Sequence, residues 1–184
     1  MVFEESFSVA PMMEWTDRHC RYFHRLLSNS AVLYTEMISA DALIFGPRHN
    51  LLVFNNEELP CVLQLGGNDP KKLALAAQYG QDYGYSKINL NIGCPSNRVQ
   101  SGAFGACLMK DPKLVAECVK TIQNNCQIPI TIKCRIGVDD MHTVQGLDNF
   151  VDEVSEAGVK LFVIHARKAP VSYTHLRAHE TFTD

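Results

Sequence analysis

Apolar and polar residues follow two different periods along this chain. Short runs of apolar and β-branched residues, four to eight long, have the length and composition of buried strands. Longer segments between them repeat their apolar residues every three or four positions, as amphipathic helices do. The predicted strands are Phe7–Met12, Val32–Met37, Cys61–Leu65, Lys87–Asn91, Ile130–Cys134 and Leu161–His165.

Helix start signals precede several of the amphipathic segments. Thr16 or Asp17 is placed to cap a first helix, and Asp69-Pro70 and Asp111-Pro112 each give an N-cap followed by proline at the first helical position. The helix after Asp111 has a clear apolar face. The apolar residues of the first helix are Tyr22, Phe23, Leu26 and Leu27, and those of the last are Phe150, Val151, Val154 and Ala157, with Gly158 placed to stop it.

Strict alternation of strand and helix predicts an α/β fold with a parallel sheet and right-handed crossovers. The chain holds six such units, whereas a (β/α)8 barrel usually takes about 250 residues. An open doubly wound sheet is the alternative, but the turn after the first strand, Pro11-Met-Met-Glu14, lacks the Gly-x-Gly-x-x-Gly pattern of such sheets. We therefore predict a (β/α)8 TIM barrel cut off after about the sixth strand, which cannot close.

Length and composition limit the classes of function that the chain could have. The 184 residues suffice for one domain, and a net charge of −3 means that nucleic-acid binding would need a local cluster of basic residues. We find no signal peptide and no apolar run of the ~20 residues that span a bilayer, so no membrane association is expected. The seven cysteines form no C-x-x-C pair, which argues against a metal site and fits a reducing, cytoplasmic setting.

The last 15 residues differ from the rest. Residues 170–184 show neither helix nor strand period, and they resemble a recurrent read-through of sequencing-adapter DNA. We expect a non-native tail here, joined to a partial barrel domain over residues 1–169. A short genuine tail is the other reading.

One thiol stands out from the others by its position. Cys94 follows a predicted strand in the stretch Asn89-Leu-Asn-Ile-Gly-Cys-Pro-Ser96, at the end of the strand where parallel α/β proteins collect their reactive side chains. A thiol there can act as an acid, a nucleophile or a metal ligand. Cysteine is more often plain packing, and we assign that role to Cys107 and the other five.

Six motifs occur together in order along the chain. They are Ser8-Val-Ala-Pro-Met-Met13, Leu63-Gln-Leu-Gly-Gly67, Ile88-Asn-Leu-Asn-Ile-Gly-Cys-Pro-Ser96, Gly102-Ala-Phe-Gly-Ala-Cys-Leu-Met109, Thr131-Ile-Lys-Cys-Arg-Ile-Gly137 and His165-Ala-Arg-Lys168. In this combination, residues 7–169 resemble the N-terminal part of the tRNA-dihydrouridine synthases, and they are most similar to the A branch of that family.

The resemblance implies a reaction. The family reduces uridine to 5,6-dihydrouridine in the D-loop of tRNA with FMN and NADPH, and the A branch is associated with positions 20 and 20a. A hydride from the reduced flavin goes to C6, and the protein supplies a proton to C5. Cys94 matches the family's proton donor, and a thiol of ordinary pKa, near ~8.5, is mostly protonated at neutral pH.

The resemblance also assigns residues to the cofactor. Lys133 and His165 match flavin contacts, and a cation beside the ring would stabilise the anionic reduced form. Gln64 matches a glutamine that contacts the flavin, because an amide can both donate to and accept from the edge of the ring. The alternative role for Gln64 is capping of a strand end. The loop of Pro11, Met12 and Met13 matches the one that lies against the isoalloxazine.

RNA contacts are assigned to one rim of the barrel. Asn91 matches a position that contacts tRNA, and four basic residues follow strand ends where they could hold RNA phosphates. These four are Arg98, Arg135, Arg167 and Lys168. The arginines of the first helix are read instead as a solvated face: Arg18, Arg21 and Arg25.

Two features of the family are missing from this sequence. The family holds the FMN phosphate with glycine-rich turns after the seventh and eighth strands, where barrels commonly bind phosphate. Its C-terminal helical tRNA-binding domain has no counterpart either. We therefore expect the 184-residue chain as written to bind FMN poorly and to be inactive.

Two other functions remain open. One is a different FMN-dependent barrel reductase that acts on free pyrimidines, such as a dihydroorotate or dihydropyrimidine dehydrogenase. The other is a non-catalytic RNA-binding remnant. No protein partner is indicated.

Overall fold

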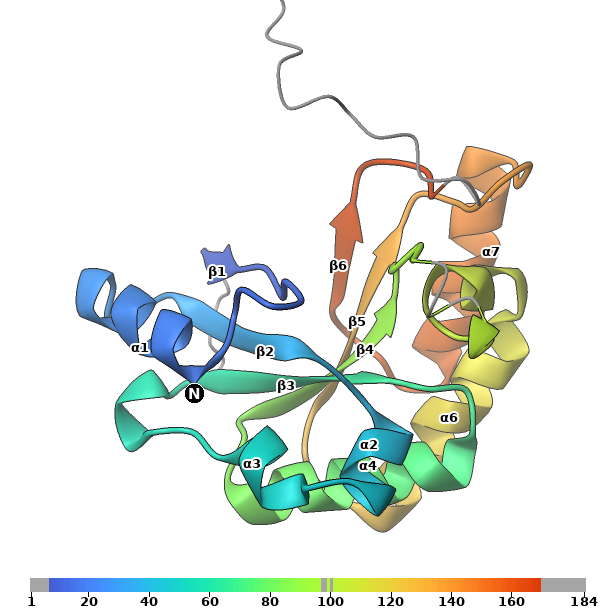
Figure 1. Ribbon diagram of the computed structural model, residues 1–184. Coiled ribbons are helices and arrows are strands. Elements are labelled where there is room, and N and C mark those ends of the chain that lie inside the picture. Colours follow the sequence, from blue (N-terminus) through green and yellow to red (C-terminus); the bar gives the residue numbers. More distant parts are fainter. Residues whose placement is uncertain (1–6, 97–98, 100, 170–184) are drawn as a thin grey trace, which may run out of the picture.

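A single parallel sheet organises the chain (Figure 1). The structure is a computed structural model that describes residues 7–96, 99 and 101–169. All neighbouring strands are parallel, and their order in the sheet is their order in the sequence. The strands are β1 (Ser8–Val9), β2 (Val32–Ser39), β3 (Cys61–Gly66), β4 (Lys87–Ile92), β5 (Ile130–Arg135) and β6 (Phe162–His165).

The strand order confirms the predicted fold. The sheet curls, as a barrel wall does, with β1 and β6 at its two edges (Figure 1). Six parallel strands with helical crossovers correspond to a TIM barrel that lacks two of its eight strands. The proposed foreign tail at residues 170–184 lies outside the described residues and stays a prediction.

Helices connect the strands, and aspartates begin three of them as predicted. Asp17 caps α1 by accepting from the backbone N–H of Cys20, and Asp69 and Asp111 cap α4 and α6 in the same way. The helices are α1 (Arg18–Leu27), α2 (Ala40–Phe45), α3 (Arg48–Leu52), α4 (Pro70–Tyr83), α6 (Pro112–Asn125) and α7 (Thr143–Glu156), with 3-10 turns η1 (Asn56–Glu58) and η2 (Gly105–Lys110). None of the helices in the described segments is long and apolar enough to cross a membrane.

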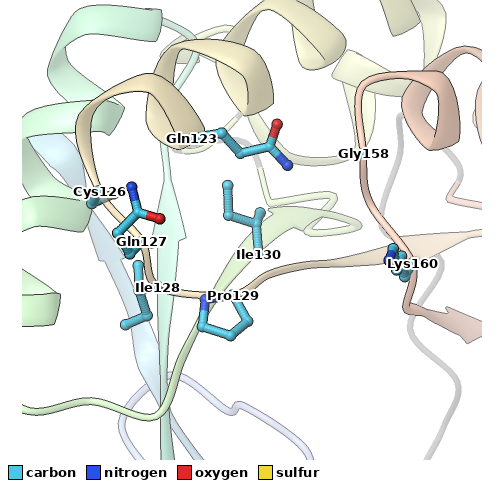
Figure 2. Close-up of a pocket in the computed structure, with 8 residues that line it drawn as sticks. All are labelled: Gln123, Cys126, Gln127, Ile128, Pro129, Ile130, Gly158 and Lys160. Atoms are coloured by element: carbon cyan, nitrogen blue, oxygen red, sulfur yellow. The ribbon is translucent and has the colours of Figure 1, made fainter.

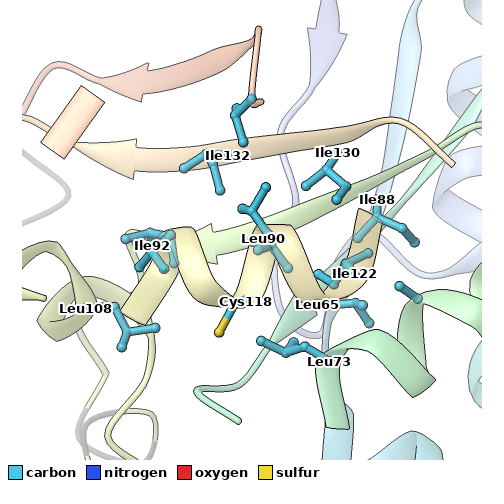
Figure 3. Packing of buried hydrophobic residues seen from close by; sticks show 14 of the residues in the cluster. Leu65, Leu73, Ile88, Leu90, Ile92, Leu108, Cys118, Ile122, Ile130 and Ile132 are labelled. Atoms are coloured by element: carbon cyan, nitrogen blue, oxygen red, sulfur yellow. The ribbon is translucent and has the colours of Figure 1, made fainter. Parts of the chain in front are cut away.

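The main core lies between the sheet and the helices that cover it. Alternate residues of β4 and β5, such as Ile88, Leu90 and Ile132, pack against α4, α6 and neighbouring strands (Figure 3). Because side chains alternate across a strand, the residues between them face the inside of the barrel. Those inward residues are mostly polar, among them Asn89, Asn91, Thr131 and Lys133. The functional side chains therefore come from the face that the helices do not cover.

The first helix is turned the other way from the sequence-based expectation. Arg21 is only 5% exposed, and Arg25 is also buried, so reading both as a solvated face was wrong. Arg21 Nε lies 2.7 Å from Glu58 Oε2, and the Arg25 guanidinium donates to the carbonyl oxygens of Glu58 and Pro60. The partners of both arginines lie in η1 or just after it, 33 to 37 positions downstream, beyond the reach of a local pattern.

The apolar side of α1 is consequently on the surface. Leu26 is 67% exposed, and its apolar neighbours Tyr22, Phe23 and Leu27 are exposed as well. The helix packs against β2 and η1 (Figure 1). In a closed (β/α)8 barrel the helices form a continuous outer ring, so this side of α1 would face the last helix of the ring.

Candidate active site

The carboxyl ends of β3, β4, β5 and β6 bring the candidate residues together. The strand register pairs Asn91 with Lys133 across β4 and β5, and Arg135 with His165 across β5 and β6. Gln64 pairs with Asn89 one step further down the sheet. The sequence-predicted candidates on these strands therefore line one inward-facing surface.

The Cys94 loop leaves the end of β4 in a fixed shape. The side-chain oxygen of Asn91 accepts hydrogen bonds from the backbone N–H groups of Gly93 and Cys94, at 3.1 and 2.8 Å. The carbonyl oxygen of Cys94 accepts from Ala106 at 2.9 Å, and the half-buried thiol donates to Ser96 Oγ at 3.5 Å. The thiol is thus held at the strand end by the protein's own backbone.

Close packing beneath this loop explains Gly105, the second glycine of the stretch Gly102-Ala-Phe-Gly105. Gly105 has a φ of 75°, and a Cβ at this position would lie 2.6 Å from the carbonyl oxygen of Cys94. Any larger residue would push the Cys94 loop away from the sheet. The glycine-containing motif therefore supports the thiol from below.

The side chain of Gln64 is held by two asparagines of β4. Its side chain is 1% exposed; Nε2 donates to Asn89 Oδ1 at 2.7 Å, and Oε1 accepts from Asn91 Nδ2 at 2.9 Å. Asn89 in turn donates to Thr131 Oγ1 at 2.9 Å. Our sequence analysis missed Asn89 and Thr131 as members of the site. The signal was present in Lys87-Ile-Asn-Leu-Asn-Ile92, where both asparagines fall on one face of the strand.

Positive charge is concentrated at the ends of β5 and β6. Burial, reinforced by the neighbouring Arg135, lowers the pKa of Lys133 below its ordinary value. Burial and then Arg135, Lys133 and Arg167 likewise lower the pKa of His165. Across residues 7–96, 99 and 101–169, no hydrogen-bond or ion-pair partner meets the Lys133 ammonium. A half-buried cation without a carboxylate, beside a second cation, is a favourable place for an anionic ligand.

The basic residues assigned to RNA differ in their surroundings. Arg135 Nε donates to the carbonyl oxygen of Gly93 at 2.7 Å, and Lys168 Nζ donates to that of Asp139 at 3.1 Å. Arg167 is exposed at the end of β6. Arg98 lies outside the described residues.

The loop after β1 carries the residues assigned to the flavin face. Met12 and Met13 are both about half exposed, and Thr16 Oγ1 fixes the loop through hydrogen bonds with the backbone N–H and carbonyl of Met12. Trp15 follows on the same loop and is 73% exposed, a feature that our sequence analysis did not single out. This loop therefore presents apolar side chains at the surface rather than to the core.

The remaining cysteines have different environments from Cys94. All seven are free thiols, and four of them are buried. Burial raises the pKa of Cys107, whose sulfur donates to the carbonyl oxygen of Phe104. Within the described part of the chain, no group of three or more His, Cys, Asp or Glu residues is arranged to hold a metal ion.

A separate cavity of about 280 Å³ lies at the opposite end of the sheet. Figure 2 shows Pro129 and Ile130 at the start of β5 facing it, with Gln123 from α6 and Lys160 from the loop before β6. Because Cys94 follows the carboxyl end of β4, this cavity is not part of the candidate site.

Comparison with known proteins decides the family. A family model described as dihydrouridine synthase (Dus) matches residues 8–181. The chain belongs to the dihydrouridine synthase family. This confirms the resemblance inferred from the six motifs.

Several curated relatives carry the same printed name, tRNA-dihydrouridine(20/20a) synthase. The chain is 57% identical over 162 residues to the proteins of Xanthomonas campestris pv. campestris and Synechocystis sp., and 55% identical over 166 residues to that of Vibrio cholerae. These matches cover 88–90% of this chain but only 48–50% of the relatives. The chain thus spans about half the length of the curated relatives it matches.

One solved structure has a similar backbone at low sequence identity. It is the carboxyl transferase domain from Rhizobium etli pyruvate carboxylase, with a TM-score of 0.47 and 14% identity over 89% of this chain and 26% of that one. A likeness of this size has no bearing on function.

Proposed function

We propose that this member of the dihydrouridine synthase family serves the reduction of uridine to 5,6-dihydrouridine in tRNA, at positions 20 and 20a. Family membership and the shared name of its relatives support this reaction. The observation that carries the proposal is local. A half-buried thiol and a half-buried lysine, which meets no counter-ion among the residues that the structure describes, occupy the ends of neighbouring strands, β4 and β5.

The residues at the strand ends fit an anionic flavin. FMN, when bound, would supply the hydride to C6 of the uracil ring, and NADPH would be the source of its electrons. Lys133 and His165 would face the flavin, because both are cations or potential cations, and no carboxylate of the described segments shifts the pKa of either one. The exposed methionines of the β1 loop, Met12 and Met13, would pack against the ring beside Pro11.

Gln64 would contribute in a more limited way. Its Nε2 donates one hydrogen to Asn89, which leaves the second for the edge of a ligand. Its oxygen already accepts from Asn91. We therefore expect Gln64 to act mainly on the arrangement of its neighbours.

Cys94 would deliver the proton to C5. The thiol belongs to a loop whose backbone is held by hydrogen bonds at Asn91 and at Ala106, which gives the sulfur a defined place at the end of β4. A positioned acid of this kind contributes about 10²–10⁴-fold to a rate. Arg167 and the other basic residues of the rim would hold RNA phosphates, while the target base leaves its stack to enter the site.

A chimera tests the proposal. Residues 1–169 are joined to the remaining C-terminal part of the Xanthomonas campestris relative and expressed in a bacterial strain that lacks its own tRNA-dihydrouridine(20/20a) synthase. Mass spectrometry and primer extension then measure dihydrouridine at positions 20 and 20a. We expect the chimera to restore the modification, the Cys94→Ala chimera to lose it, and the matched Cys107→Ala chimera to keep it.

Two results would overturn the proposal. One is full modification by the Cys94→Ala chimera, and the other is reduction of free uracil or orotate by the purified chimera while tRNA stays unmodified. The second outcome would point to a reductase of free pyrimidines.

A further inference from the structure

We propose that Thr131 positions the Cys94 thiol from a distance, through a directional chain of three side-chain amides. The chain runs across β5, β4 and β3 and returns to β4. It deepens the proposed function, because it depends on Cys94 being the working thiol. Its test, however, uses chemical readouts that need neither tRNA nor flavin.

The far end of the chain is fixed by a backbone carbonyl. Thr131 Oγ1 donates to the carbonyl oxygen of Ile88 at 3.3 Å, and a carbonyl can only accept. The hydroxyl oxygen then accepts from Asn89 Nδ2 at 2.9 Å. This bond turns the oxygen of the Asn89 amide toward β3.

The middle of the chain passes this orientation on. Asn89 Oδ1 accepts from Gln64 Nε2 at 2.7 Å, and Gln64 Oε1 accepts from Asn91 Nδ2 at 2.9 Å. The strand register places these residues side by side, with Gln64 opposite Asn89 and Asn89 opposite Thr131. Each amide thus has its nitrogen and oxygen assigned by its neighbour.

The near end is fixed by two backbone donors. Asn91 Oδ1 accepts from the N–H groups of Gly93 and Cys94. A backbone N–H can only donate, so the direction required here agrees with the direction set at Thr131. Turning any single amide over would place two oxygens or two N–H groups against each other.

Burial makes such a mismatch costly. Asn89, Gln64 and Thr131 are all buried, so water does not replace a lost partner. Buried polar networks polarise one another, and an unsatisfied member is strongly unfavourable. Loss of the Thr131 hydroxyl leaves the Asn89 nitrogen buried without its partner, so Asn89 should shift, and the disturbance should reach Asn91 and the Cys94 loop.

The test compares two buried threonines in the 184-residue chain. Thr131→Val removes the end of the chain. The matched control is Thr35→Val, because the Thr35 hydroxyl also donates to one backbone carbonyl, of Glu36, and accepts one N–H, of Gln64. The Thr35 hydroxyl contacts only the backbone of Gln64 and makes no hydrogen bond with its side-chain amide.

Two measurements report on the loop. One is the rate of alkylation of each cysteine, resolved by mass spectrometry of its peptide, and the other is hydrogen exchange of the Gly93 and Cys94 amides. For Thr131→Val we expect both rates at Cys94 to rise by about threefold or more, as for a coupling of ordinary size. Cys20 and Cys107, which are also half-buried, should be unchanged in both variants.

A conservative variant separates positioning from general loosening. In Thr131→Ser the hydroxyl that donates to the Ile88 carbonyl and accepts from Asn89 is kept, so Cys94 should react as in the parent. Asn89→Leu should behave like Thr131→Val, and this pair decides the matter if Thr131→Val does not fold. Unchanged Cys94 rates in Thr131→Val, or equal rises in Thr131→Val and Thr35→Val, would overturn the inference. If the proposed function fails but these rates change as expected, only the catalytic part is lost.

Discussion

The guanidinium of Arg135 donates a hydrogen bond of 2.7 Å to the carbonyl oxygen of Gly93, the residue before the candidate acid. Arg135 ends β5, and Gly93 follows β4, so the bond joins two neighbouring strand ends above the sheet. A second nitrogen of the guanidinium donates to the carbonyl oxygen of Lys168. A residue assigned to RNA from the sequence thus also supports the thiol loop and lies close enough to Lys133 and His165 to lower their pKa values.

Charge and hydrogen bonding by Arg135 can be separated by two substitutions. In Arg135→Met we expect the pKa of His165 to rise toward its ordinary value, because a neighbouring cation is lost. In Arg135→Lys the charge stays and the pKa of His165 should remain low. NMR titration of the His165 imidazole measures both. Equal titration in the two variants would contradict this account, and Arg48→Met, a distant change, should have no effect.

Removing one partner of the buried ion pair between Arg21 and Glu58 should destabilise the fold strongly. Glu58→Gln keeps the oxygen that accepts from Asn55 but leaves Arg21 buried without its counter-charge. We expect the free energy of unfolding to fall by about 3 kcal/mol, as for other broken buried ion pairs. Urea denaturation followed by circular dichroism gives the value.

The double variant and a surface control complete this experiment. Arg21→Met together with Glu58→Gln should recover at least about 1 kcal/mol, because no uncompensated buried charge remains. Arg18→Met on the exposed side of α1 should change the stability by less than about 0.5 kcal/mol. Strict additivity of the two buried changes would show that the pair is not coupled.

Lys133 should lower the stability of the fold at neutral pH. Its pKa is lower in the folded chain than in the unfolded chain, so between these two values the unfolded chain binds more protons and stability rises with pH. Below the folded pKa the full penalty is present. Lys133→Met should therefore raise the urea midpoint at pH 7, and the gain should disappear as pH rises past the unfolded value near ~10.5. A variant that is less stable at pH 7 would refute this.

The exposed side of α1 should tolerate charge in the 184-residue chain. Leu26→Lys is expected to change the free energy of unfolding by less than about 0.5 kcal/mol and to reduce aggregation, because the side chain is 67% exposed. Leu43→Lys, at a fully buried position, should prevent folding. In the chimera completed with the Xanthomonas campestris segment, Leu26→Lys should cost about 2 kcal/mol or more if a closing helix covers this face. An equal effect in both chains would show that the face stays open.

Local patterns were sufficient for the order of the strands and for the longer helices, but they did not predict α2 and α3. Five of the six predicted strands and the aspartate caps at Asp17, Asp69 and Asp111 agree with the structure, because periodicity and capping act within a few residues, whereas only Ser8–Val9 of the predicted strand Phe7–Met12 is a strand. Short strands alternating with helices also led to the correct parallel arrangement. The thiol at Cys94 was singled out by its place after a strand and by the motif around it, and its role stays a prediction.

Long-range contacts decided the rest. The residues near Arg21 in the sequence do not indicate its partner Glu58, which is 37 positions away. The buried side of α1 was therefore predicted wrongly. The chain from Thr131 through Asn89 and Gln64 to Asn91 likewise exists only because the strand register brings three strands into line. The sequence by itself determined the elements and the chemistry they carry, since these depend on neighbours along the chain. Only the tertiary structure decided which charges are neutralised, which side chains are oriented by hydrogen bonds and which cation lacks a partner among the described residues. The reason is that these contacts join residues that are far apart in the sequence.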